Sequence, residues 1–516
     1  MPALLRSLLL GALLLLAGCA QLPARPQLPY QAALPVAEGT RLDAEVAPAV
    51  ARHPGASGFR LVADGMEAFA LRGHSARSAG RSLDIQTYIW HDDLTGRLLA
   101  AEVLDAADRG VQVRVLLDDL DARAKSQALL ALDSHPRISI RIFNPLATRD
   151  GMLGTALEFA SDFERVNRRA HNKSWIVDGR LAVAGGRNLG DEYFMASPEA
   201  NFQDLDLLVA GPAVAALADA FDSYWNSESA WPIRALEPRK PQGEALQAVR
   251  ESLRQSTSDA GKEAWVQALG EPDALARIRV GHLGMRWTQQ WQLLQDAPDK
   301  LVQQVQPIAG TDASPILAGL RSAMQSSQRE IAIISPYFVP GEEGANSLVA
   351  GVRGGLRIRI LTNSLASNDV AAVHGGYVRH RGVLARGGVE LWEMKPRPGR
   401  AQGSLLGSSG ARLHGKAAIF DRRTLFVGSL NLDPRSVQLN SEQGLLVTDE
   451  VLAAQLSAMF DNMTRPENAW SIGWDPARGR VSWSDGNGTL DREPEAGLSR
   501  RVVARLAYWL PVDPLL

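Results

Sequence analysis

Apolar and polar positions follow strand and helix periods in alternation through the first part of the chain. Residues 82–93 form an apolar, β-rich run that ends in polar residues, as a buried strand does. Residues 96–110 repeat apolar positions at helical spacing, and residues 110–119 alternate as a half-buried strand. Strand–helix–strand succession predicts a sheet with helices packed on its faces.

The same succession returns in the second part of the chain. A strand is predicted at 330–343, a helix at 346–355 and a second alternating strand at 355–364. An internal repeat of this length indicates a duplicated α/β unit. We place the two predicted domains at 58–232 and 308–475.

Two further segments lie outside these domains. Residues 233–307 are polar and helix-prone, which suits a connector or an insertion. The tail at 476–516 is rich in turn residues and then reads LSRRVVARLAYWLP, with three arginines among apolar side chains. That last segment either lies in a membrane interface or docks back on the fold.

The amino terminus has the pattern of an export signal. Residues 1–18 hold one arginine and an apolar run too short for a membrane span, and Cys19 follows Leu16-Ala17-Gly18. This resembles a bacterial lipobox, so we expect Cys19 to be acylated and residues 19–57, rich in Pro and Ala, to form a tether. The prediction is a lipoprotein of the bacterial envelope that faces the periplasm. Ala20 favours the outer over the inner membrane; the alternative is an ordinary signal peptide.

Composition narrows the function further. The chain has 516 residues, enough for two or three domains, with 55 basic against 57 acidic residues. A near-zero net charge argues against a general nucleic-acid binder. Cys19 is the only cysteine, so disulfides and thiolate metal sites are excluded.

One motif occurs twice in identical internal register, 243 residues apart. It reads H-x-K-x-x-x-x-D, then six residues, then G-[GS]-x-N. Its members are His171, Lys173, Asp178, Gly185, Gly186 and Asn188 in the first copy, and His414, Lys416, Asp421, Gly428, Ser429 and Asn431 in the second.

These residue types suit displacement at a phosphate ester. A neutral imidazole is a nucleophile near pH 7, and a second, protonated imidazole can donate to the leaving oxygen. Two lysines stabilise the charge of the transition state. We expect Gly186, Asn188, Ser429 and Asn431 to bind the phosphate, and the scheme needs neither metal nor cofactor.

The acids around the motif receive separate predictions. Matching the shared LLV strings places Asp204 opposite Glu442, and we expect these two carboxylates to orient the imidazoles. Asp178 and Asp421 belong to the catalytic motif, yet their position after a strand favours fixing a hairpin turn. His171 and Lys173, two apart on an expected strand, should leave the same face.

Other polar residues at predicted strand ends have two interpretations each. Tyr88 and Tyr337 contact substrate or pack in the core. The remaining candidates line an acceptor pocket, bind an anionic headgroup or are solvated loop residues: Asp118, Asp119, His374, Tyr377, Arg165, Arg168 and Arg169.

The duplicated motif resembles that of the phospholipase D superfamily. Strings such as TYIWHDDLTGRLL, HNKSWIVDGRLAVAGGRNLGDEYF and LNLDPRSVQLNSE are similar to those of bacterial cardiolipin synthases of the C type. The resemblance covers residues 60–475 and implies two α/β/α sandwich halves related by a pseudo-two-fold axis, with one active site at their seam. It also implies transfer through a phosphohistidine, with His171 as nucleophile and His414 as acid.

The function that follows is phosphatidyl transfer to phosphatidylglycerol, from phosphatidylglycerol or phosphatidylethanolamine. A hydrolase that releases phosphatidic acid is the alternative, since partition depends on how dry the site is. A nuclease or other phosphodiesterase, and a lipid-binding scaffold without turnover, are further alternatives. An outer-membrane sorting signal departs from the inner-membrane location that the resemblance implies.

Overall fold

The computed structural model describes residues 22–36, 38–149, 158, 162–237, 243–270, 284–301, 314–396 and 412–509. The predicted lipidation site, Cys19, lies outside these residues. In the part of the chain so described, no helix combines the length and the apolar character that crossing a membrane requires.

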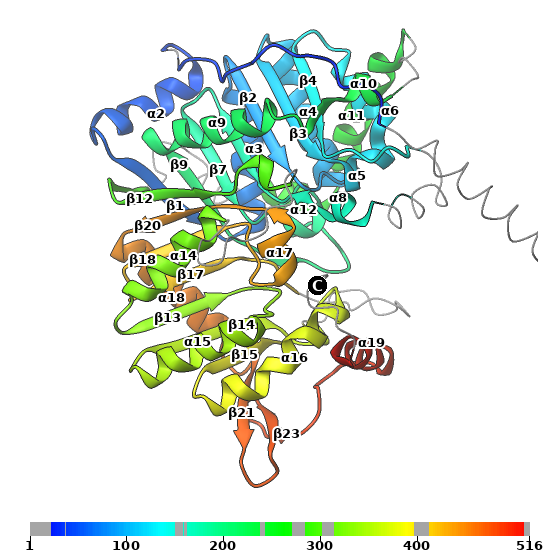
Figure 1. Ribbon diagram of the computed structural model, residues 1–516. Helices are drawn as coiled ribbons and strands as arrows, with labels where there is room; N and C mark the ends of the chain where they lie inside the picture. Colours follow the sequence, from blue (N-terminus) through cyan, green and yellow to red (C-terminus); the bar gives the residue numbers. More distant parts are fainter. Residues whose placement is uncertain are drawn as a thin grey trace, which may run out of the picture.

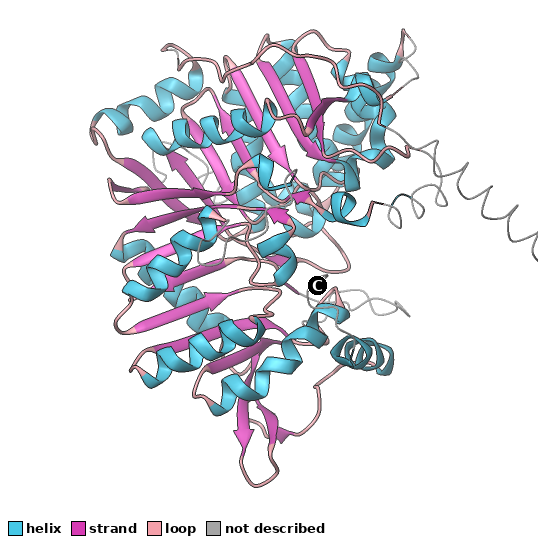
Figure 2. Ribbon diagram, in the orientation of Figure 1, coloured by secondary structure: helices cyan, strands magenta, loops and turns pink. Residues whose placement is uncertain are grey.

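Two large mixed sheets form the molecule, one above the other in Figure 1, and helices cover their faces (Figure 2). The strands of the first sheet are β1 (Ser57–Val62), β2 (Ser82–Thr87), β3 (Gln112–Asp118), β4 (Ile138–Phe143), β6 (Ser174–Val177), β7 (Leu181–Gly185), β9 (Asp206–Ala210), β10 (Ala230–Pro232) and β11 (Arg286–Thr288). The strands of the second are β12 (Trp291–Gln295), β13 (Glu330–Ile334), β14 (Arg357–Asn363), β15 (Glu390–Met394), β17 (Ala417–Phe420), β18 (Thr424–Gly428), β20 (Gln443–Thr448), β21 (Ala469–Asp475), β22 (Arg480–Ser484) and β23 (Thr489–Leu490).

The helices divide between the halves in the same way. The first half holds α2 (Arg41–Ala51), α3 (Gly65–Ser78), α4 (Leu94–Asp108), α5 (Asp119–Ala122), α6 (Ser126–Asp133), α8 (Phe163–Asn167), α9 (Pro212–Trp225), α10 (Ile233–Leu236), α11 (Ala245–Ala260) and α12 (Ala264–Leu269). The second half holds α14 (Pro315–Ser326), α15 (Gly341–Arg353), α16 (Ala371–Arg386), α17 (Pro434–Gln438), α18 (Glu450–Met463) and α19 (Leu498–Trp509).

The strand order shows the duplication directly. The first sheet runs β10-β4-β3-β2-β6-β7-β9-β1, followed by β11. Read from its other end, the second sheet runs β21-β15-β14-β13-β17-β18-β20-β12, with β22 and β23 added beside β21. The central pairs β2–β3 and β13–β14 are parallel, and β2–β6 and β13–β17 are antiparallel. The fold is therefore two α/β halves with the same strand order, as the duplicated sequence predicts.

This repeat shifts the expected domain limits. β12 is the counterpart of β1, so the second repeat begins at Trp291, inside the segment 233–307 that we assigned to a connector. In the tail, β22 and β23 extend the second sheet and α19 packs on α16. Hydropathy patterns do not locate such edge strands, because they are short and only partly buried.

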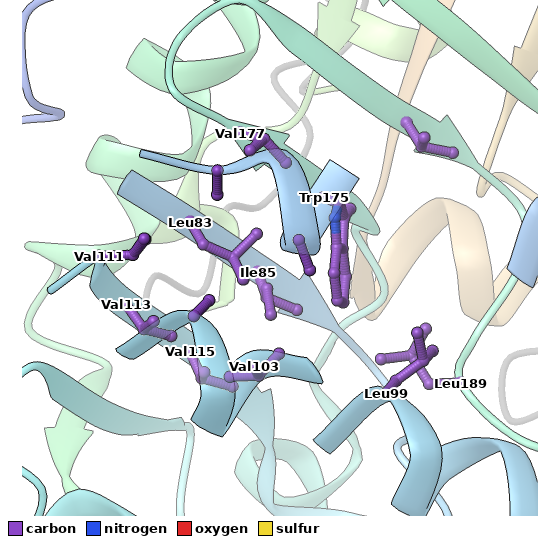
Figure 3. Close-up of a cluster of buried hydrophobic side chains, with 14 of the residues drawn as sticks. Leu83, Ile85, Leu99, Val103, Val111, Val113, Val115, Trp175, Val177 and Leu189 are labelled. Atoms are coloured by element: carbon purple, nitrogen blue, oxygen red, sulfur yellow. The ribbon is translucent and has the colours of Figure 1, made fainter. Parts of the chain in front are cut away.

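The core of the first half shows why these segments form strands. Leu83 and Ile85 of β2 and Val113 and Val115 of β3 point to one face, where Trp175 of β6 joins them (Figure 3). On the other face the guanidinium of Arg114 is 2.6 Å from the Asp84 carboxylate and is covered by α9. Because both faces are covered, all six residues of β2 are buried.

A second apolar cluster joins the halves. It contains Phe59 and Val209 from the first sheet and Ile419, Val427 and Val447 from the second. Helix α9 contacts β12, and α18 contacts β1, so each half lends a helix to the other. The two sheets therefore share one hydrophobic core at their seam.

Candidate active site

Each motif histidine lies one residue beyond a short parallel pairing that crosses the seam. Strand β5 (Arg169–Ala170) pairs with β19 (Asn440–Ser441), and the backbone N–H of His171 donates to the Ser441 carbonyl at 2.9 Å. Strand β16 (Arg412–Leu413) pairs with β8 (Phe202–Gln203), and the N–H of His414 donates to the Gln203 carbonyl at 2.9 Å. Both histidines are thus set at the seam by backbone hydrogen bonds.

The expected strand through His171 and Lys173 differs from the structure. Strand β6 begins at Ser174, and residues 171–173 are irregular. The reason is the hydrogen bond just described, because the backbone of His171 pairs with the second half instead of continuing the ladder of its own sheet.

The carboxylate on each imidazole comes from the opposite half. Nδ1 of His171 lies 2.8 Å from Oε2 of Glu442, and Nδ1 of His414 lies 2.5 Å from Oδ2 of Asp204. All four side chains are largely buried. An acid on Nδ1 fixes the ring and the tautomer, and Nε2 of each imidazole is then available to a substrate.

The two lysines turn back toward the histidines. Nζ of Lys173 donates to the His171 carbonyl at 2.6 Å, and Nζ of Lys416 lies 3.0 Å from Nδ1 of His414 and donates to its carbonyl. Burial lowers the pKa of Lys173 to about 7 and that of Lys416 to about 8. The site therefore holds two buried ammonium groups that titrate close to neutral pH.

We call His171 with Glu442 the first half-site and His414 with Asp204 the second. The pKa values of their ionisable groups differ. Burial and the nearby lysines lower the pKa of the His171 imidazole well below its usual range, and that of His414 is also lowered. Burial raises the pKa of Glu442 to about 7. Burial acts in the same direction on Asp204, but His414 and Lys416 outweigh it and hold the pKa of Asp204 well below its usual range.

Aromatic rings pack against both imidazoles. The ring of Tyr88 meets His171 edge to face at 5.1 Å between centroids. The rings of Tyr193 and Phe202 lie 5.2 and 5.0 Å from His414. Sequence reasoning identified Tyr88 but missed Tyr193 and Phe202. These two residues lie between the first motif copy and β9, and no motif position identifies them.

Three residues expected to bind phosphate have other contacts. Oδ1 of Asp204 lies 2.3 Å from where a Cβ on Gly186 would stand, so the glycine makes room for a carboxylate and not for a ligand. The Ser429 hydroxyl donates to Glu442 at 2.5 Å and accepts from the N–H of Gln443 at 3.0 Å. Nδ2 of Asn188 donates to the Tyr193 hydroxyl at 2.9 Å.

The fourth expected phosphate ligand is Asn431. Its Oδ1 is buried and has no hydrogen-bond partner among the described residues. A buried carbonyl oxygen that accepts no hydrogen bond destabilises the fold. The Asn431 oxygen therefore retains the capacity to accept a hydrogen bond from a ligand or a water.

The motif aspartates brace turns at the far ends of the strands. Asp178 has a positive φ of 53°, and its carboxylate accepts from the backbone N–H groups of Gly80, Arg81 and Ser82 at 2.8–3.0 Å. Asp421 accepts from three successive N–H groups, those of residues 328–330, at the same distances. Neither carboxylate contacts a motif histidine or lysine in these interactions.

The remaining polar candidates are engaged elsewhere in the fold. Asp118 is buried with Arg169, and Asp119 with Arg149. Arg165 pairs with Glu158 and Asp162, which disfavours a headgroup role for this cluster. His374 and Tyr377 are buried in α16, and His374 lies 3.5 Å from Glu493 of the C-terminal segment.

Sequence reasoning missed one acid beside the pair of His171 and Glu442. Asp296 is fully buried at the end of β12, accepts from the backbone N–H of Glu442 at 3.2 Å and pairs with Lys300 at 2.7 Å. It lies in the expected connector, so no motif pointed to it. Its contact with the Glu442 backbone makes it a positioning residue for that half-site.

Two groups among the described residues have spacing suited to a cation. They are His91, Asp93 and Glu192, and His374, Glu393 and Glu493. Arg381 already pairs with both acids of the second group at 2.8 Å, and Asp93 of the first group caps α4. Neither group includes a motif histidine or lysine.

Comparison with known proteins agrees with this geometry. The family described as "Cardiolipin synthase, PLD-like domain" matches residues 74–225 and 320–464. Cardiolipin synthase C of Escherichia coli is 40% identical over 486 residues, which cover 92% of this chain and all of that protein. Cardiolipin synthase A of Pseudomonas syringae is 27% identical over 402 residues, 78% of this chain and 67% of that protein.

A solved structure shares the fold. Phosphatidylserine synthase of Haemophilus influenzae superposes with a TM-score of 0.54 at 14% identity, covering 87% of this chain and 91% of that one. The two segments matched by the family coincide with the two halves, and each contains one motif histidine and lysine. The chain therefore belongs to the phospholipase D superfamily, in the cardiolipin synthase family with two PLD-like domains.

Proposed function

We propose that this protein is a phosphatidyltransferase of the cardiolipin synthase type, which moves the phosphatidyl group of one phospholipid to phosphatidylglycerol. Family membership supports an enzyme of the phospholipase D type. The single observation that carries the proposal is the composite site. Two imidazoles from opposite halves are each held at Nδ1 by a carboxylate from the other half, and two buried lysines lie beside them.

The reaction has two displacements. Nε2 of His171 attacks the phosphorus of the donor lipid, the bond to the headgroup oxygen breaks, and His414 gives that oxygen its proton. A phosphatidyl group is then held on His171. The acceptor hydroxyl passes its proton to His414 and attacks the same phosphorus, which releases His171. Lys173 and Lys416 offset the charge on the phosphoryl oxygens.

The assignment of roles rests on the unequal half-sites. His171 has a strongly lowered pKa, and the carboxyl beside it has a pKa of about 7, which favours a neutral nucleophilic ring. The carboxyl of Asp204 stays ionised because its pKa is held low. Its negative charge beside Nδ1 stabilises the imidazolium form of His414 and offsets part of the effect of burial and Lys416, which lower the pKa of that ring.

The donor and acceptor lipids and the membrane location of the protein are part of the same proposal. Phosphatidylglycerol is the acceptor, and phosphatidylglycerol or phosphatidylethanolamine is the donor. Acylation of Cys19 anchors the protein to a bacterial membrane with the site facing the periplasm, in the outer membrane by its sorting residue. The Leu16–Cys19 string and the Pro- and Ala-rich residues after it support this location.

The test uses purified protein in mixed micelles of phosphatidylglycerol, with and without phosphatidylethanolamine, and mass spectrometry of the lipid products. Cardiolipin formed by the wild type and not by the His414→Ala variant is the expected result. Its dependence on phosphatidylethanolamine names the donor. Phosphatidic acid without cardiolipin would replace the transferase with a hydrolase in which water takes the phosphatidyl group.

The anchor is tested separately. Cys19→Ser protein should leave the membrane fraction and keep its activity in detergent, because the acyl chains and not the fold hold it there. Membrane fractionation equal to that of the wild type would contradict the lipobox assignment.

A further inference from the structure

The C-terminal helix α19 is fixed to the second half by one face only. Ala504 and Ala507 are buried against α16, and a Cβ on Gly375 of α16 would stand 2.5 Å from the Ala504 carbonyl oxygen. The Arg379 guanidinium donates to the Ala507 and Tyr508 carbonyls at 2.7 and 3.0 Å. The two helices lie side by side at the edge of the molecule in Figure 1. The orientation of α19 is thus determined by close packing of small residues.

The opposite face of α19 is apolar and exposed. At about 100° per residue, its large apolar side chains cover an arc of about 140°, which also contains the exposed Ser499. Arg505 is exposed beside this arc, and Tyr508 is also exposed. The outer face consists of Leu498, Val502, Val503, Leu506 and Trp509, with exposures of 80, 48, 45, 58 and 73%.

Helix α19 also contacts a loop that leads to the second motif histidine. Arg500 of α19 donates to the carbonyls of Leu365 and Asn368, in the loop that follows β14. At the start of that loop, the Asn363 side chain donates to the carbonyl of Leu413 at 2.9 Å, directly before His414. The loop therefore connects α19 to the second half-site.

Three other exposed apolar side chains lie close in sequence to strands of the two halves. Val370 immediately precedes α16, Leu120 lies in α5 just after β3, and Phe163 begins α8 just ahead of β5, with exposures of 43, 47 and 42%. Strands β3 and β14 run parallel to both of their neighbours, and Leu120 and Val370 follow the carboxyl ends of these two strands. Large apolar side chains that stay exposed beside a catalytic site indicate an interaction surface.

We propose that the outer face of α19 is a membrane-docking surface, which lies in the headgroup region of a phospholipid bilayer and presents the active-site edge to the lipids. This inference rests on the proposed function, because lipid substrates reside in that bilayer. Aromatic and arginine side chains beside an aliphatic stripe suit the membrane interface, where rings and cations meet headgroups and the aliphatic groups enter the acyl boundary. Acyl chains on Cys19 hold the protein near the membrane, and α19 sets its orientation.

The first experiment places a fluorophore on this face. Cys19 is the only cysteine, so Cys19→Ser gives a full chain that accepts one label at Val503→Cys. The control is Val451→Cys, which has a similar exposure of 42% and begins α18 at the opposite edge. With vesicles of phosphatidylglycerol and phosphatidylethanolamine, a bimane at 503 should shift to shorter wavelength and one at 451 should not. Equal behaviour at both positions would overturn the proposal.

The second experiment separates docking from chemistry. In the Cys19→Ser background, Leu506→Glu should lower the rate on vesicles by about tenfold or more, because a carboxylate replaces an exposed apolar side chain that would insert into the membrane, next to anionic headgroups. Its rate on monomeric short-chain phosphatidylglycerol should equal that of the parent, and Val451→Glu should match the parent on both substrates. If Leu506→Glu acts on vesicles at the rate of the Cys19→Ser parent, the proposal is wrong.

Two other outcomes have distinct meanings. If the parent forms no cardiolipin from either substrate, the proposed function fails, and the bimane shift still decides the docking surface. If the label at 503 is shifted without vesicles and Leu506→Glu converts a dimer to a monomer in sedimentation, a second copy covers this face and the membrane proposal is overturned.

Discussion

The two half-sites use different residues to hold an imidazole in the same way. Asp204 reaches His414 across the seam and needs the space that Gly186 leaves empty. Glu442 reaches His171, and the hydroxyl of Ser429 donates to it from the position equivalent to Gly186. Both acids are fully buried, but His414 and Lys416 hold the pKa of Asp204 well below its usual range. Burial raises the pKa of Glu442 to about 7, although Lys173 and the Ser429 hydroxyl act to lower it. The G-G and G-S pairs of the motif therefore match the two different acids that they contact.

Replacing either acid by its amide should slow turnover without unfolding the protein. For Asp204→Asn and Glu442→Gln we expect kcat to fall by about 10²–10⁴-fold, because the imidazole loses its orienting charge or adopts the wrong tautomer. The measurement is kcat in phosphatidylglycerol micelles, with circular dichroism as the folding control. Turnover by Asp204→Asn at the rate of the wild type would remove the acid from the mechanism.

The lysines should set the alkaline limit of activity. Their pKa values of about 7 for Lys173 and about 8 for Lys416 lie below the usual range, so each loses its positive charge as the pH rises through that value. A guanidinium stays charged, so Lys416→Arg should keep its alkaline limb at higher pH than the wild type. The measurement is kcat/KM against pH. Lys262→Arg, at an exposed position, should leave the profile unchanged.

At the scale of elements, the motif residues lie at or near strand ends, and the turn between β6 and β7 fixes the position of those strands relative to β2. The hairpin between β6 and β7 needs left-handed backbone at Asp178 and Gly179, with φ of 53° and 62°. The Asp178 carboxylate then ties that turn to the start of β2 through three N–H groups. This explains why the motif aspartate follows the histidine at constant spacing although it lies at the other end of the strand.

Removing this brace should cost stability and not chemistry. We expect Asp178→Asn to lower the free energy of unfolding by about 1–3 kcal/mol, because three backbone N–H groups lose a carboxylate acceptor. Asp421→Asn should cost less, since that carboxylate is partly exposed. Urea denaturation measures both, with the exposed Asp105→Asn as control. A selective loss of kcat at unchanged stability would assign Asp178 a role in catalysis.

At the scale of the whole molecule, the halves are one folding unit. The cluster around Phe59, Val209 and Val427 crosses the seam, and two short parallel pairings cross it beside the histidines. Neither motif histidine pairs with an acid of its own half. The duplication therefore produced one active site and not two.

Thermal unfolding should reflect this shared core. We expect one cooperative calorimetric transition in which both halves melt together, because separating them exposes the apolar cluster. Val209→Ala, a truncation in that cluster, should lower the single Tm without splitting it. Two resolved transitions would show that the halves unfold independently.

The central strands and helices of the fold were predictable from the sequence, whereas the edge strands that bound the two sheets were not. The periodicity at 82–119 and 330–364 predicts β2, α4, β3, β13, α15 and β14, because these elements bury apolar residues at a regular spacing. The edge strands β11 and β12 and the hairpin of β22 and β23 bury few residues and lack that signal. Their assignment depends on which sheet edge is available, which is a property of the assembled halves.

The sequence by itself determined the duplication, the two histidines, the two lysines and the family, since these follow from residue identity and local spacing. Tertiary structure decided which acid holds which imidazole, because the partners lie 271 and 210 residues apart and meet only across the seam. It also decided that Ser429 and Gly186 serve the acids and that α19 leaves an apolar face exposed. Burial and long-range contact set these properties, and neither is encoded in the neighbours of a residue along the chain.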